Sequence, residues 1–182
     1  MKTVDDINFD ELYSKASYFF HLLYDYQPHL SRPIELPHAD LLTYVHPFRN
    51  LLDCQEHVDN HRQRMITLFT TDRKFLDWHG NPSGLNPNLD EIYVYCDTLE
   101  GRLKMFKSKN SYSKKIQEVI MVEKLDLYLL FVGLKYIQLV AEEFEYDPDV
   151  QNRFLDDGQR IVEAMGSFFA SGATRLSEEA AN

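Results

Sequence analysis

Apolar side chains recur at alternating steps of three and four residues through the segment NPNLDEIYVYCDTLEGRLKMF. The positions are Leu89, Ile92, Cys96, Leu99, Leu103 and Phe106. This spacing lines up one face of a helix. Asn86 suits the N-cap and Pro87 suits the first helical position, so the pattern predicts a helix over 87–106. The alternative is an α+β fold with a hairpin at 91–107, because IYVYC and RLKMF are rich in β-forming residues.

Helical patterns also fill most of the remaining chain. Segments with one apolar face occur at 12–26, 47–69 and 148–170, and shorter helical segments at 40–45 and 72–79. The segment 114–143 is apolar on nearly every side, which is typical of a helix at the centre of a bundle. We therefore expect an all-α helical bundle of about five main helices around this central, nearly all-apolar helix. The bundle would form a single domain over 1–171, followed by a flexible tail at 172–182.

Charge and composition exclude several classes of partner. The 29 acidic and 19 basic side chains give a formal net charge of −10, which repels nucleic acid and anionic lipid. The apolar window 125–140 is shorter than the roughly 20 residues of a membrane span, and the N-terminus lacks a signal-peptide pattern. Cys54 and Cys96 have no metal-binding or disulfide spacing. We expect a cytoplasmic protein with reduced thiols and no membrane contact.

His57 and His61 stand one helical turn apart, which is the spacing typical of a metal chelate. A continuous helix over 47–69, counted at ~100° per residue from Phe48, turns both rings away from the apolar face. His21 likewise falls opposite the apolar face of its predicted helix. We therefore predict no metal centre and no cofactor, with His57 and His61 as the candidate ligands if a metal does bind.

The same helical count places polar residues inside the apolar stripe of segment 47–69. They are Gln55, Asp59 and Arg62. Buried polar groups need partners, and Asp126 is the lone acid of the apolar segment 125–140. We expect Arg62 to bridge the two helices through Asp59 and Asp126, more as a structural lock than as an active site.

A basic run without acids occurs between positions 102 and 115. It contains Arg102, Lys104, Lys107, Lys109, Lys114 and Lys115, six of the 19 basic residues of the chain. One interpretation is a patch for an anionic ligand or an acidic partner surface. The other is a solvated helix end, where cations meet the C-terminal helix dipole favourably.

The segment RKFLDWH has the arginine-to-histidine spacing of the ribonuclease motif in HEPN helical domains, carried by Arg73 and His79. The resemblance covers seven residues, and Lys74 stands where family members usually carry a small polar residue. It implies a ribonuclease centred on Arg73 and His79.

No convergent catalytic pattern emerges from the sequence, and no phosphate-binding glycine loop is present. We therefore favour a non-enzymatic, acidic helical interaction or regulatory module over an enzyme. Its partner would be another protein of unknown identity, or a second copy of the chain. The alternatives are a metal-dependent hydrolase that uses histidine and carboxylate ligands, or a HEPN-like ribonuclease.

Overall fold

The chain forms a five-stranded parallel β-sheet flanked by helices, so the predicted all-α bundle is wrong. The computed structural model describes residues 1–25 and 33–180, with side chains described as far as residue 171. The strand order is β2-β1-β3-β4-β5, and every neighbouring pair is parallel. This is one of the common orders of doubly wound α/β sheets, in which the direction of winding reverses between β1 and β3.

The elements have the following bounds. The strands are β1 (Tyr18–Leu23), β2 (His46–Phe48), β3 (Met65–Thr71), β4 (Leu89–Cys96) and β5 (Ile116–Met121). The α-helices are α1 (Leu51–Asn60), α2 (Asp72–His79), α3 (Leu99–Tyr112), α4 (Leu125–Glu143) and α5 (Pro148–Ala180). Short 3-10 helices are η1 (Val4–Asp6), η2 (Glu11–Lys15), η3 (Ala39–Leu41) and η4 (Val122–Lys124). The chain divides into two compact units, Met1–Asp126 with the sheet and Leu127–Asn182 with α5 and most of α4.

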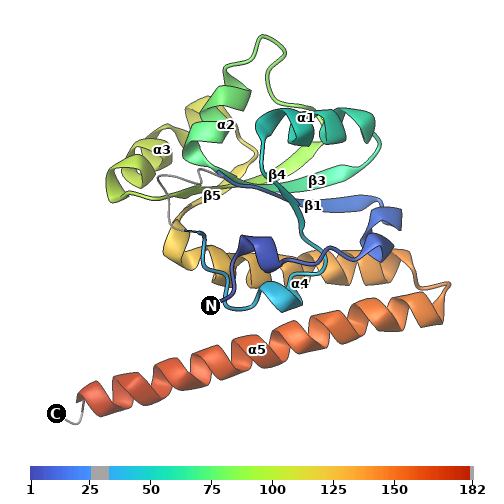
Figure 1. Ribbon diagram of the computed structural model, residues 1–182, viewed down its shortest axis with the longest axis vertical. Coiled ribbons are helices and arrows are strands. Elements are labelled where there is room, and N and C mark those ends of the chain that lie inside the picture. The colour runs from blue at the N-terminus through green and yellow to red at the C-terminus, as the bar shows by residue number, and fades with distance from the viewer. Residues whose placement is uncertain (26–32, 181–182) are drawn as a thin grey trace. The chain divides into compact units, whose positions relative to one another are not determined.

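Helices α1, α2 and α3 lie over the same face of the sheet (Figure 1). The core on this face joins strand residues such as Phe19, Leu68 and Val94 to helix residues such as Val58, Trp78 and Met105. The other face is also buried and is rich in aromatic rings. There Phe20 stacks on Phe69 with ring centroids 5.3 Å apart, and its edge contacts Tyr44 at 5.2 Å. The central strands are therefore covered on both faces, as is usual in parallel sheets.

Three of the helices that follow strands begin at a capping side chain. The side chains of Asn50, Thr71 and Thr98 accept hydrogen bonds from the backbone N–H groups of Asp53, Lys74 and Gly101, respectively. Each cap satisfies an N–H group that has no partner inside the helix. These caps fix where α1, α2 and α3 begin.

In the second unit, α4 and α5 pack against each other. A Cβ atom at Gly158 would lie 3.4 Å from Ile137 Cγ2 and 3.7 Å from Leu134 Cδ1, so this glycine allows close approach of the two helices. The Gln151 side chain donates a hydrogen bond to the Ala141 carbonyl at 3.0 Å. The two helices therefore form a hairpin with both apolar and polar contacts.

Most predicted helices are each divided between a strand and a helix. Segment 12–26 contains β1, 47–69 contains α1 and β3, 87–106 contains β4 and α3, and 114–143 contains β5 and α4. The hairpin alternative at 91–107 is also wrong, because only IYVYC forms a strand, β4, whereas RLKMF lies in helix α3. Residues 26–32, where the predicted helix 12–26 ends, lie outside the described residues.

Other expectations are met more closely. The helix at 72–79 is confirmed as α2, and the predicted start at Pro148 is confirmed for α5. Helix α5 does not end near residue 170 as predicted, since its backbone stays helical to Ala180, through most of the predicted tail. Cys54 and Cys96 are free thiols. Within residues 1–25 and 33–180, no helix combines the length and the apolar character that a bilayer crossing requires.

Candidate metal centre

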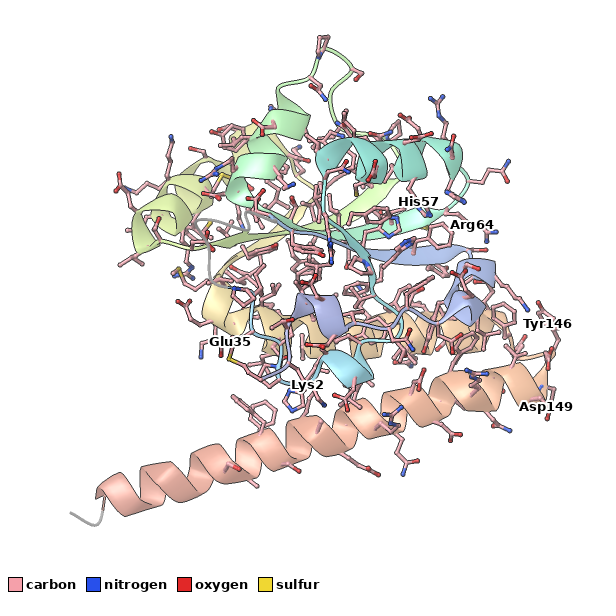
Figure 2. All side chains as sticks on the ribbon, in the orientation of Figure 1. Lys2, Glu35, His57, Arg64, Tyr146 and Asp149 are labelled. Atoms are coloured by element: carbon pink, nitrogen blue, oxygen red, sulfur yellow. The ribbon has the colours of Figure 1, made fainter. Side chains whose placement is uncertain are left out.

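Three histidines from three different elements converge on the α1 side of the sheet. His21 of β1 and His46 of β2 are paired residues of two adjacent parallel strands, so both side chains leave the same face. His57 reaches them from α1, and Figure 2 shows its ring between that helix and the strands. One candidate ligand atom from each ring lies within 4.8 Å of the others. The parallel register of β1 with β2 thus creates a three-imidazole group.

The spacing of the ring nitrogens suits a shared metal ion. His21 Nε2 lies 3.1 Å from His57 Nδ1. Two nitrogens bound to one tetrahedral Zn²⁺ at about 2.0–2.1 Å would be roughly 3.3 Å apart. In the metal-free protein the same contact is a hydrogen bond between two neutral rings, in which one nitrogen must carry the proton.

Burial keeps these imidazoles uncharged. His21 is only 1% exposed, and its Nδ1 atom makes no hydrogen bond to any described residue. Burial, and then the neighbouring His57 and His46, hold the pKa of His21 well below its ordinary value. Burial, and then the neighbouring His46 and His61, lower the pKa of His57 to about 4, and burial also lowers the pKa of His46. At neutral pH the rings therefore present lone pairs rather than positive charges.

Aromatic side chains hold the imidazoles in place. Phe48 and Phe9 both stack on His46, with centroid separations of 4.4 Å and 4.7 Å. Phe19 lies 5.8 Å from the His21 ring and 5.6 Å from the His57 ring. This apolar shell limits the access of water and fixes the ring orientations, as the surroundings of metal ligands commonly do.

The orientations predicted for His21 and His57 are wrong. Because α1 is capped by Asn50 and begins at Leu51, Phe48 belongs to β2 and cannot set the phase of the helix. The buried face of α1 is formed by Cys54 and Val58, while Leu52 is 75% exposed. His57 lies beside that buried face and is only half-exposed. His21 is buried because it belongs to a strand covered on both faces and not to a helix.

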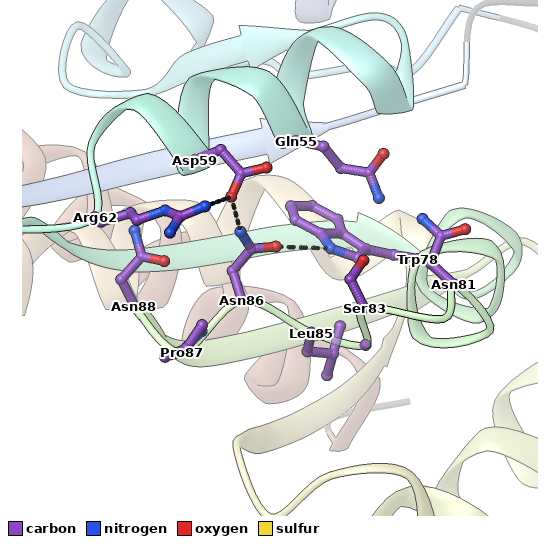
Figure 3. A pocket seen from close by; sticks show the side chains of 11 residues that line it. Gln55, Asp59, Arg62, Trp78, Asn81, Ser83, Leu85, Asn86, Pro87 and Asn88 are labelled. Carbon is purple, nitrogen blue, oxygen red and sulfur yellow. Dashed lines mark hydrogen bonds and ion pairs between the residues drawn. The ribbon is translucent and has the colours of Figure 1, made fainter.

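The predicted polar cluster is divided. Gln55, Asp59 and Arg62 line a pocket of about 400 Å³ on the other flank of α1 (Figure 3). Asp59 Oδ1 accepts hydrogen bonds from Arg62 at 3.3 Å and from the Asn86 amide at 2.8 Å. The Arg62 side chain is 77% exposed, so it is not a buried lock.

Asp126 takes no part in that network. It contacts His38, with Asp126 Oδ2 2.6 Å from His38 Nδ1 and Oδ1 3.1 Å from the His38 backbone nitrogen. The predicted bridge from Arg62 to Asp126 is therefore absent among the described residues. The prediction failed because it assumed that 47–69 and 114–143 were two facing helices.

Some cations of the basic run contact backbone carbonyls, while three others are exposed. Arg102 donates to the Val119 carbonyl at 3.1 Å and Lys115 donates to the Pro87 carbonyl at 2.7 Å. Lys104, Lys107 and Lys114 are exposed. The apolar residues predicted to be buried in this segment are also exposed: Leu99 by 60%, Leu103 by 47% and Phe106 by 50%. The outer side of α3 thus combines an apolar stripe with lysines.

Arg73 and His79 do not form a joint site. Both belong to α2, but Arg73 is exposed whereas His79 Nε2 lies 3.0 Å from the Tyr112 carbonyl oxygen. The His79 ring also packs against Tyr112 and Phe75. At six residues apart on one helix the two side chains lie on different faces, and no contact joins them within the described residues.

Acidic residues gather where β1, β3 and β4 end, which the sequence analysis did not anticipate. They are Asp25, Asp72 and Asp97, and the pKa of Asp97 is raised by burial and then by Asp72 and Asp25. Carboxyl ends of strands are the usual ligand position in doubly wound sheets. Here, however, the Lys74 ammonium lies 3.3 Å from Asp25 and offsets part of the charge. The histidine group has the stronger claim, because it contains a buried polar atom without a partner.

In comparisons with known proteins, no family model, no curated protein and no solved structure matches this chain.

Proposed function

We propose that this protein binds a divalent transition metal ion, with Zn²⁺ as the first candidate, through His21, His46 and His57. The observation that carries the proposal is the convergence of three imidazoles from β1, β2 and α1 within 4.8 Å. One of them is buried, and its Nδ1 has no hydrogen-bond partner among the described residues. His21 Nε2, which lies 3.1 Å from His57 Nδ1, would be the ligand atom, and the free energy of metal binding would offset the desolvation cost of the buried ring.

The ligand set favours particular metals. Neutral imidazoles suit Zn²⁺, Cu²⁺ and Ni²⁺, whereas Mg²⁺ and Ca²⁺ prefer carboxylate and carbonyl oxygens. The lowered pKa values of His21, His46 and His57 mean that few protons must be displaced when a metal binds at neutral pH. The free thiols of Cys54 and Cys96 support a reducing compartment such as the cytoplasm as the place of action.

Metal uptake tests the proposal directly. Protein freed of metal with a chelator is dialysed against Zn²⁺, and bound zinc is measured by elemental analysis. We expect one zinc ion per chain, and a loss of affinity of at least about tenfold in His46→Ala, since even the outer partners of metal ligands contribute 10–100-fold. His79→Ala is the matched control, because His79 contacts Tyr112 and not the centre. Unchanged zinc affinity in His46→Ala would refute the proposal.

The outer side of α3 supports a second proposal, the binding of a protein partner. Leu99, Leu103 and Phe106 follow the three-four spacing and form one exposed apolar stripe. Lys107 lies exposed beside this stripe, and Lys109 Nζ lies 5.4 Å from the Phe106 ring centroid. Such a surface suits a partner segment that carries apolar and acidic side chains, by packing and by charge complementarity. We propose such a segment of another protein as the ligand.

Paired variants test this surface. Phe106→Asp removes an apolar contact and Lys107→Glu reverses a charge, so both should abolish the capture of a partner from the native cell. Lys15→Glu, a charge reversal at an exposed site in η2, should leave the capture unchanged. Binding of the wild type to anionic vesicles, or self-association in light scattering that Phe106→Asp abolishes, would show a different ligand for α3.

A further inference from the structure

We infer that His61 is the fourth ligand of the metal centre and closes it against water. This inference rests on the proposed metal binding by His21, His46 and His57. It decides between two kinds of centre. With three histidines and a water molecule the ion would keep an open position for catalysis, whereas four protein ligands are typical of a closed, structural or metal-storing site.

The proton on His61 is already placed as a metal ligand requires. His61 Nδ1 lies 2.7 Å from the His57 carbonyl oxygen, one helical turn back. A carbonyl oxygen can only accept, so Nδ1 carries the hydrogen and the neutral ring has its lone pair on Nε2. Histidines that bind metals commonly donate their second N–H to a backbone carbonyl in this way.

The ring of His61 belongs to the same aromatic group as the three converging imidazoles. Its centroid lies 4.3 Å from the His57 centroid and 5.1 Å from the Phe19 centroid. His57 and His61 have the i, i+4 spacing at which two helical imidazoles can share one ion.

The backbone around His61 is held from outside the helix. His61 is the C-cap of α1, and its N–H donates to the Val58 carbonyl at 3.2 Å. The Asn88 side-chain amide donates to the carbonyls of Val58 and His61, at 3.1 Å and 3.2 Å. His61 lies outside the close group within 4.8 Å formed by His21, His46 and His57, so its side chain must turn toward the ion while this backbone stays in place.

Closure has a chemical consequence. Four neutral imidazoles around a divalent ion leave no position for a water molecule, so the metal cannot generate the hydroxide on which a zinc hydrolase depends. The centre then holds the metal, or joins β1, β2 and α1 through it, without hydrolytic chemistry. A site of this kind fits the regulatory class of function better than the metal-dependent hydrolase.

Cobalt substitution tests the inference. Co²⁺ is bound to the wild type and to His61→Ala, and the visible absorption of each complex is recorded before and after addition of azide, an anion that replaces metal-bound water. In the wild type azide should leave the spectrum unchanged. In His61→Ala it should change the spectrum, and Co²⁺ affinity should fall at least about tenfold. His61→Gln, a second variant of similar size, and far-UV circular dichroism separate this effect from unfolding.

Each outcome has one meaning. If the wild type takes up Co²⁺ and azide changes its spectrum as much as that of His61→Ala, the fourth position is open and His61 is not a ligand. The proposed metal binding would survive that result. If the wild type takes up no Co²⁺ at all, the proposed function itself fails, and the assignment of His61 fails with it.

Discussion

Zinc at a thousandfold excess over its dissociation constant is expected to raise the free energy of unfolding by about 4 kcal/mol, through binding to the native state alone. The expected rise in melting temperature is on the order of 10 °C for a chain of this length. The reason is geometric, because His21, His46 and His57 come together only when β1, β2 and α1 are folded. Thermal denaturation followed by circular dichroism, with and without Zn²⁺ at pH 7, measures the effect.

Matched controls identify the source of this stabilisation. Mg²⁺ should give no increase, because the centre offers only nitrogen ligands. His46→Ala should lose the zinc effect while His79→Ala keeps it. An equal rise in melting temperature for wild type and His46→Ala would mean that zinc acts elsewhere, for example on exposed carboxylates.

The pH dependence of the zinc effect follows from the same histidines. The pKa of His57 is lowered to about 4 in the folded protein, against about 6.5 for a free histidine. The unfolded chain therefore binds more protons between these values, so the metal-free protein loses stability as the pH falls from about 6.5 to about 4. Zn²⁺ stays bound to the neutral histidines through most of this pH range. The stabilisation by zinc should disappear as the pH falls through about 4.

The local signals of helix initiation were readable from the sequence. Thr71 before α2 and the Asp147–Pro148 pair before α5 are ordinary capping patterns, and both helices begin where these residues indicate. The same reasoning applied to Asn50 and Asp53 would have started α1 at Leu51. Its buried face would then have been centred on Cys54 and Val58, which turns His57 toward the sheet.

The strands of the parallel sheet were not recognised from the sequence because they are buried on both faces. Strand β4 contains Ile92, Val94 and Tyr95, whose side chains are buried on both faces, so no alternation of polar and apolar residues marks it. The three-four spacing across 89–106 joins two unrelated elements. Its first half is the core of β4, and its second half is the exposed stripe of α3.

The metal centre could be predicted only in part, for a related reason. The spacing of His57 and His61 is a local signal, and it was present in the sequence. The contributions of His21 and His46 depend on the pairing of β1 with β2. This pairing brings together two residues that are 25 positions apart in the sequence. No local pattern encodes that register, because it is fixed by which strands become neighbours in the sheet.

His21→Leu is expected to abolish zinc binding while leaving the metal-free protein as stable as the wild type, or more stable by about 1 kcal/mol. The substitution replaces a buried ring that has an unpaired Nδ1 with an apolar side chain of similar size, so a desolvation cost is removed. His57 loses its contact with His21 Nε2, but it is half-exposed and can bond to water instead. Urea denaturation and zinc titration of the same preparation measure both effects.

A neighbouring substitution should change the free energy of unfolding in the opposite direction, and this contrast makes the prediction specific. Leu23→Ala, two residues along on the same strand and the same face, leaves a cavity and should cost about 2–5 kcal/mol. If His21 were retained for packing, His21→Leu would also destabilise the protein and zinc would be irrelevant to the comparison. A histidine that weakens the metal-free core and yet is required for zinc uptake is explained by ligation, because burial alone would favour leucine at this position.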